Sequence, residues 1–197
     1  MRKAIPDHST TALLYPSDRS YLLVFVVPTL CLWYCSRTSR NNTPIMASPE
    51  QVELNQPHAP GSNAIEAFNT VLRAIKSEIV RSRHHWDKHE PKMWSRIAHL
   101  SDHELTHFTI EKDLVVVRSG ATSYGNIIFG KIRIPAVNDD EGEGFIHVRI
   151  HDPPNHGTGD VKFHSILTVE GNRNAEGHPT TWRAIQTRDA PLEFFNE

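Results

Sequence analysis

Residues 124–134 read YGNIIFGKIRI and residues 145–151 read FIHVRIH, and these two stretches decide the fold class. In the second stretch, Ile146, Val148 and Ile150 alternate with polar side chains, which is the two-residue period of a half-buried β-strand. Four further runs have the composition of strands: 108–110, 114–117, 161–170 and 181–188. No segment between these runs is long and apolar enough to be a crossover helix, so we expect an antiparallel meander of five or six strands.

A long amphipathic helix is predicted ahead of the strands. Ser62 has the residue type of an N-cap. The apolar positions that follow recur with helical spacing, at Ile65, Phe68, Val71, Leu72, Ile75 and Ile79. A second, short helical face follows between Met93 and Leu100. Residues 62–197 are therefore expected to form an α+β domain, in which both helices pack on one face of a flat or curled sheet.

Residues 1–45 differ from the rest of the chain in composition. They hold both cysteines, Cys31 and Cys35, and carry a net charge of +3, whereas residues 46–197 carry −5. Residues 20–36 form a run of 17 uncharged positions, the lower limit for a membrane-spanning helix, although Pro28 interrupts it. Three alternatives stay open: a membrane signal-anchor, a working protein that begins at Met46, and, least favoured, a cleaved signal peptide.

The remaining composition constrains compartment and partners. Residues 46–61 are polar and rich in proline, so they are expected to be a linker. Residues 62–197 contain no cysteine, which favours a reducing compartment such as the cytoplasm, with a membrane anchor at residues 20–36 as an addition. The mild acidity of this part argues against nucleic acid as a partner.

Cationic and titratable side chains alternate with apolar ones on the predicted strands. Those that would share one sheet surface are Lys131, Arg133, His147, Arg149, His151 and His164. Such a surface would suit an anionic small ligand, through its phosphate or carboxylate, or another protein. The alternative interpretation is the ordinary solvated face of a half-exposed sheet.

One short motif has a known mechanism. Residues 103–107 (HELTH) match H-E-x-x-H, in which His103 and His107 would bind zinc and Glu104 would deprotonate a zinc-bound water. In this respect the five residues resemble the zinc-peptidase motif. However, Ser101 and Glu104 fit the capping box of a helix start, and no Asp or Glu lies between Asp113 and Asp139 to supply a third ligand.

Three functional hypotheses follow. The leading one is a non-catalytic binding or interaction domain that uses the sheet face away from the helix and needs no cofactor. The first alternative is a zinc-dependent hydrolase built on His103, Glu104 and His107. The second is an enzyme acting on a small ligand in a pocket between helix and curled sheet, with acid–base groups drawn from His147, His151 and His164.

Overall fold

The computed structural model describes residues 52–154 and 160–196, all within one unit of the chain, Thr43–Glu197. The uncharged run at residues 20–36 and both cysteines lie outside the described residues. Among the helices that are described, none combines the length and the apolar character needed to cross a membrane.

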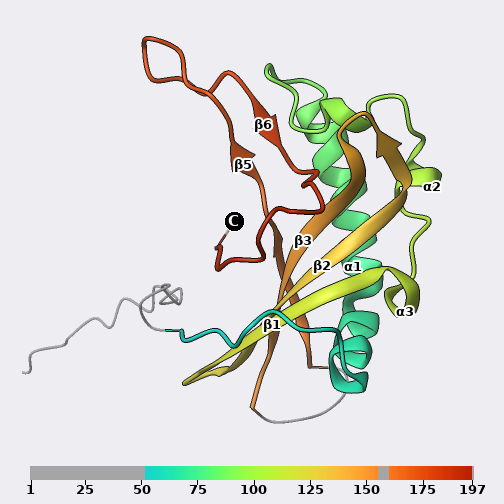
Figure 1. Cartoon of the computed structure of the whole chain (residues 1–197), viewed down its shortest axis with the longest axis vertical. Coiled ribbons are helices and arrows are strands. Elements are labelled where there is room, and N and C mark those ends of the chain that lie inside the picture. Colours follow the sequence, from blue (N-terminus) through green and yellow to red (C-terminus); the bar gives the residue numbers. More distant parts are fainter. Residues whose placement is uncertain (1–51, 155–159, 197) are drawn as a thin grey trace, which may run out of the picture. The chain divides into compact units, whose positions relative to one another are not determined.

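An antiparallel sheet of four strands forms the centre of this unit, in the order β1-β2-β3-β4 (Figure 1). The strands are β1 (Leu114–Thr122), β2 (Gly125–Asp139), β3 (Gly142–Asp152) and β4 (Lys162–Ile166). Two short strands, β5 (Val169–Glu170) and β6 (Trp182–Arg183), pair separately as a second sheet. The predicted α+β class and antiparallel pairing are therefore confirmed.

The predicted single meander of five or six strands is wrong. The run 161–170 is divided between β4 and β5, and the run 181–188 contains only the two residues of β6 as a strand. Residues 171–181 between β5 and β6 are mostly polar, so this hairpin has little apolar surface to bury against the main sheet. It pairs with itself instead.

The helical segments all lie on one side of the sheet. They are α1 (Ser62–Trp86), the 3₁₀ turn η2 (Ser95–Ile97), α2 (Asp102–Leu105) and α3 (Ile110–Asp113). Gly61, not Ser62, is the N-cap of α1, and no side chain caps this end. The predicted strand at residues 108–110 is also wrong: the Asp113 carboxylate accepts a hydrogen bond from the Thr109 backbone N–H (3.0 Å), which favours a helical turn over a strand.

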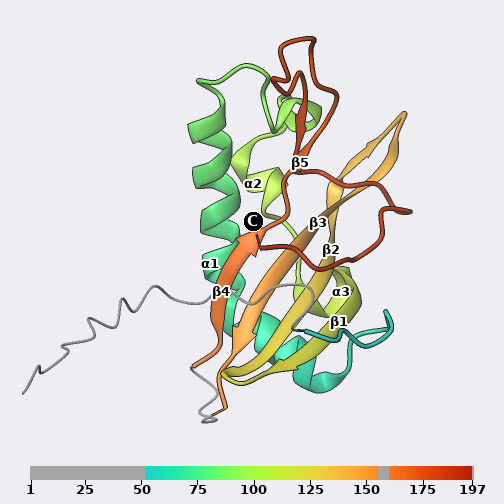
Figure 2. The ribbon, with the colours of Figure 1, turned by 90° about the vertical axis from the view of Figure 1, so that its left-hand side faces the viewer.

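One face of the four-stranded sheet packs against α1, which runs along it (Figure 2). Four buried residues of α1 share one apolar cluster with inward-facing residues of β2 and β3. They are Phe68, Val71, Ile75 and Ile79 of α1, Ile132 and Ile134 of β2, and Ile146, Val148 and Ile150 of β3. Gly130 of β2 makes this approach close, since a Cβ there would lie 2.3 Å from Cζ of Phe68.

Two segments from opposite ends of the described chain lie on the other sheet face. Val52 packs with Leu192, Phe195 and the β2 residues Ile127 and Phe129 in a second apolar cluster. Residues 52–58 also follow the edge of β1: His58 and Val117 exchange two backbone hydrogen bonds, of 3.1 and 2.9 Å. Residues 52–58, expected to be a linker, are thus ordered by the unpaired backbone groups of an edge strand. We call residues 188–196 the C-terminal strap and the sheet face that it covers the strap face.

Candidate functional site on the strap face

Strand register brings three of the predicted site residues together. β2 and β3 pair Lys131 with His147 and Phe129 with Arg149. Because alternate residues of a strand share a face, Lys131, His147 and Arg149 are neighbours on the strap face. All three are buried, with exposed fractions of 5, 0 and 4%. This part of the face is therefore covered rather than solvated.

Every strand of the four-stranded sheet donates a side-chain hydrogen bond to a main-chain carbonyl of the C-terminal strap. The bonds run from Arg118 Nη1 on β1 to Leu192 O (2.9 Å), from Lys131 Nζ on β2 to Arg188 O and Ala190 O (2.8 Å for the latter), from Arg149 Nη1 on β3 to Phe195 O (3.0 Å) and from Ser165 Oγ on β4 to Asn196 O (3.1 Å). These donors hold the strap through its backbone, whatever its side chains are.

Aromatic side chains complete the contact. The ring of Phe195 meets that of Phe129 edge-on, with 5.1 Å between centroids, and Phe194 lies 5.6 Å from the same ring. The Arg149 guanidinium lies over Phe194, with its carbon 5.3 Å from the centroid. Edge-on aromatic pairs and cation–π contacts of this kind each contribute about 0.5–1.5 kcal/mol. Two aromatic side chains and the backbone carbonyls thus attach the strap.

The strap face contains buried positive charge without a paired carboxylate. Within the described residues, Lys131 and Arg149 donate only to carbonyl oxygens and to the amide oxygen of Asn196. Burial lowers the pKa of Lys131, and the nearby charge of Asp189 partly offsets this lowering. Burial also lowers the pKa of Arg149. Since a buried charge is stabilised best by an opposite charge, these two groups are under-compensated.

His147 lies inside this cationic cluster. Neither of its ring nitrogens has a hydrogen-bond partner among the described residues. Burial, and secondly the charge of Lys131, lowers the pKa of His147 to about 4. The imidazole is therefore neutral at pH 7, and it adds no third charge to those of Lys131 and Arg149.

The other three predicted residues lie apart from this cluster. Arg133 forms ion pairs with Asp113 (2.9 Å) and Glu143 (3.4 Å), and these hydrogen bonds raise its pKa. His151 contacts the carbonyl oxygen of Tyr124 through Nε2 (3.0 Å). His164 contacts the hydroxyl of Ser165 through Nδ1 (2.9 Å) on the outer strand β4. The histidines proposed as acid–base groups are thus in three different environments.

Sequence reasoning missed Arg118, Ser165 and the whole strap. The two-residue period of β1 could have predicted the position of Arg118, since Val116 and Arg118 lie on the same face as Lys131 and Phe129. The strap itself has no repeating pattern, and only the fold shows which surface residues 188–196 cover.

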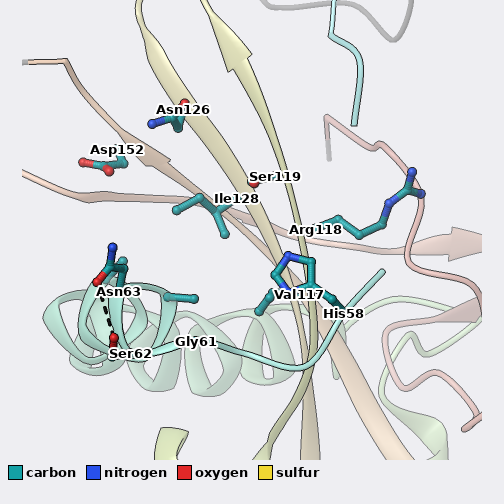
Figure 3. A pocket seen from close by; sticks show the side chains of 12 residues that line it. His58, Gly61, Ser62, Asn63, Val117, Arg118, Ser119, Asn126, Ile128 and Asp152 are labelled. Carbon is teal, nitrogen blue, oxygen red and sulfur yellow. Dashed lines mark hydrogen bonds between the residues drawn. The ribbon is translucent and has the colours of Figure 1, made fainter. Parts of the chain in front are cut away.

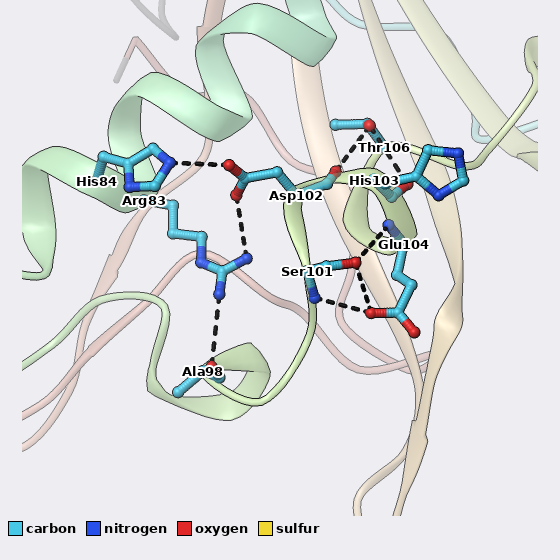
Figure 4. Close-up of polar contacts among 8 residues, drawn as sticks. All are labelled: Arg83, His84, Ala98, Ser101, Asp102, His103, Glu104 and Thr106. Atoms are coloured by element: carbon cyan, nitrogen blue, oxygen red, sulfur yellow. Dashed lines mark hydrogen bonds and ion pairs between the residues drawn. The ribbon is translucent and has the colours of Figure 1, made fainter.

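Glu104 of the H-E-x-x-H motif caps the start of the short helix α2 together with Ser101 (Figure 4). Glu104 Oε2 accepts hydrogen bonds from the Ser101 backbone N–H (2.8 Å) and hydroxyl (2.7 Å), and Ser101 Oγ accepts one from the Glu104 backbone N–H (3.3 Å). These bonds lower the pKa of Glu104. The rings of His103 and His107 lie 5.4 Å apart. Across residues 52–154 and 160–196, no three His, Cys, Asp or Glu side chains are grouped to hold a metal ion.

Two surface hollows have linings that include none of Lys131, His147 and Arg149. One, of about 500 Å³, is lined by polar side chains such as His58, Asn126 and Asp152 at the start of α1 (Figure 3). Arg118 also borders it, but its side chain is directed away from the others drawn (Figure 3). The other, of about 600 Å³, lies beside β4 and reaches the end of the strap, because its lining includes Ser165 and Asn196 as well as Trp182 and His164.

Comparison with known proteins gives no further guide. The chain matches no protein-family model, and neither the curated proteins nor the solved structures show significant similarity to it. The geometry of the strap face is therefore the basis for a functional assignment.

Proposed function

We propose that this domain is a non-catalytic protein-interaction module that holds an extended polypeptide segment on its strap face. The observation that carries the proposal is the row of side-chain donors, one from each strand, that bind main-chain carbonyls of the C-terminal strap. The strap acts as the resident occupant, and a partner segment replaces it.

Main-chain recognition makes such an exchange chemically reasonable. Donors that bind carbonyl oxygens accept any extended segment, since every residue carries a carbonyl. Side chains then supply selectivity: Leu192 and Phe195 of the strap are buried among Ile127 and Phe129. A competing segment is therefore expected to present apolar side chains with the spacing of these two residues.

The strap competes from within the same molecule. A short tether gives such a segment an effective concentration in the millimolar range. A free peptide of the same sequence therefore binds the wild-type chain poorly, and the occupancy of the strap must be lowered before binding can be measured.

The experiment uses the full-length chain with Leu192→Ala and Phe195→Ala. These changes remove both buried apolar anchors of the strap and leave the sheet donors in place. The probe is an acetylated, amidated peptide with the sequence of residues 190–196, carrying a fluorophore, and the readout is fluorescence anisotropy. We expect this variant to bind the peptide at least tenfold more tightly than the wild type does.

Two controls separate recognition from non-specific adhesion. Adding Arg149→Gln to the double variant removes a sheet donor and is expected to weaken binding about tenfold, as for the loss of a charged hydrogen-bond donor. A peptide of the same composition in scrambled order is expected to bind the double variant more weakly than the native peptide does, because it lacks the spacing of the two buried anchors. A double variant that unfolds cooperatively but does not bind the peptide would refute the proposed function.

A further inference from the structure

The strap forms no ion pair with Lys131 or Arg149, although the charge of Asp189 partly compensates that of Lys131. Lys131 donates to two carbonyls, and Arg149 donates through Nη1 to a carbonyl and to the amide oxygen of Asn196. Nε of Arg149 is buried and has no partner among the described residues. All these acceptors are neutral, although both donors are charged.

Other arginines of the molecule bind carboxylates, although Arg118 on the strap face, like Arg149, donates to carbonyl oxygens. Arg96, whose side chain is 11% exposed, holds Asp139 with two bonds of 2.8 and 2.7 Å. Arg133, which points to the strap face at another position, binds Asp113 and Glu143. A charged acceptor makes a stronger bond to guanidinium than a neutral one does. The strap face is therefore better matched to a segment with a carboxylate than to the strap.

We infer that the partner segment is acidic and places an Asp or Glu side chain where the strap has Asn196. This inference rests on the proposed function and adds the chemical class of the partner. The Asn196 amide is the one side-chain group of the strap bonded to a buried cation, so the position is defined. An aspartate has the shape of that amide and supplies the missing negative charge.

The test compares three probes on the full-length Leu192→Ala/Phe195→Ala chain. The first is the peptide of residues 190–196, the second is the same peptide with Asn196→Asp, and the third is inorganic phosphate. We expect the aspartate peptide to bind about tenfold more tightly than the asparagine peptide, the difference between a charged and a neutral acceptor. Adding Arg149→Gln should abolish that difference, whereas Arg133→Gln on the same face should preserve it.

Each outcome has a distinct meaning. Equal affinity of the two peptides overturns the acidic partner but leaves the proposed function standing. Phosphate that displaces the aspartate peptide at equal concentration shows an anion site and overturns a polypeptide partner. Failure of both peptides to bind removes the proposed function itself.

A second measurement needs no added ligand. In the otherwise wild-type chain, Asn196→Asp is expected to slow backbone amide exchange in the strap about tenfold, because the strap itself then supplies the carboxylate. The same change together with Arg149→Gln should give no slowing. Unchanged exchange in the single variant would overturn the inferred preference.

Discussion

At the residue scale, buried basic groups distinguish this domain. Lys131, His147 and Arg149 lie together on adjacent strands, and all are almost fully covered. The two charged groups are stabilised by carbonyl dipoles, and the imidazole stays neutral. Protonation of His147 can be measured through the pH dependence of the free energy of unfolding.

The folded domain is expected to lose stability as the pH falls from 6.5 towards 4. The pKa of His147 in the folded state is about 4, below its ordinary 6.5. Between these values the unfolded chain takes up a proton that the folded chain does not, so stability present above pH 6.5 is lost on acidification. The loss attributable to this residue is about 2 kcal/mol between pH 7.5 and pH 5. Urea unfolding at both pH values measures it.

His147→Leu is the informative variant for this prediction. It should reduce the difference in unfolding free energy between the two pH values by about 2 kcal/mol. His178→Asn, a histidine replacement at an exposed position, serves as the control. Identical pH dependence in wild type and His147→Leu would show that this imidazole does not titrate as described.

At the element scale, the contact between α1 and the sheet depends on a glycine. Gly130→Ala would place a Cβ 2.3 Å from Cζ of Phe68 and 2.9 Å from Cδ1 of Leu114. We expect the free energy of unfolding to fall by about 1–3 kcal/mol, the usual cost of overpacking a core. Chemical denaturation measures the loss.

A double-mutant cycle tests whether the ring of Phe68 is the cause. Phe68→Leu shortens the side chain that α1 places over Gly130. Its cost should be smaller in the Gly130→Ala background than in the wild type, by about 1 kcal/mol. Additive effects would place the strain elsewhere.

The start of α2 provides a second test at this scale. Ser101→Ala removes the hydroxyl that receives the Glu104 N–H and donates to its carboxylate. We expect a loss of about 1 kcal/mol in unfolding free energy, typical of a lost N-cap. Ser123→Ala, in the exposed β1–β2 turn, should change it by less than about 0.5 kcal/mol. Equal effects of the two changes would contradict the capping role.

At the scale of the whole molecule, the sheet is covered on two faces in different ways. The face towards α1 is closed by a continuous apolar core, whereas the strap face is closed by a smaller cluster and by side-chain bonds to carbonyls. None of the described backbone–backbone hydrogen bonds involves residues 191–196. The strap should therefore open at a lower free energy than the sheet does.

Amide hydrogen exchange tests this order of opening. The amides of Leu192, Phe194 and Phe195 should exchange at least a hundredfold faster at pH 7 than those of Ile132 and Val148 in the central strands. The amides of Ile132 and Val148 are protected by the hydrogen bonds between β2 and β3. The strap, in contrast, is held through its carbonyl oxygens, which leaves its amides without such protection. Equal protection would show that strap and sheet open as one unit.

The pattern of apolar and polar residues along the chain was enough to predict the central strands and their antiparallel pairing. The alternation in residues 145–151 predicted β3, and the absence of an apolar crossover segment predicted antiparallel pairing. The S-x-x-E pattern at Ser101 predicted the capping box, because it depends on contacts only three residues apart. These features are fixed by neighbours along the chain.

Only the tertiary structure decided which side chains meet and what covers them. Strand register placed Lys131 beside His147, and the return of the chain end put residues 188–196 over Arg149. Period-two alternation assigns a residue to a face, but it cannot tell whether that face meets solvent or another segment. A surface predicted to be cationic and open is therefore buried beneath a strap, because burial depends on contacts between residues up to 74 positions apart.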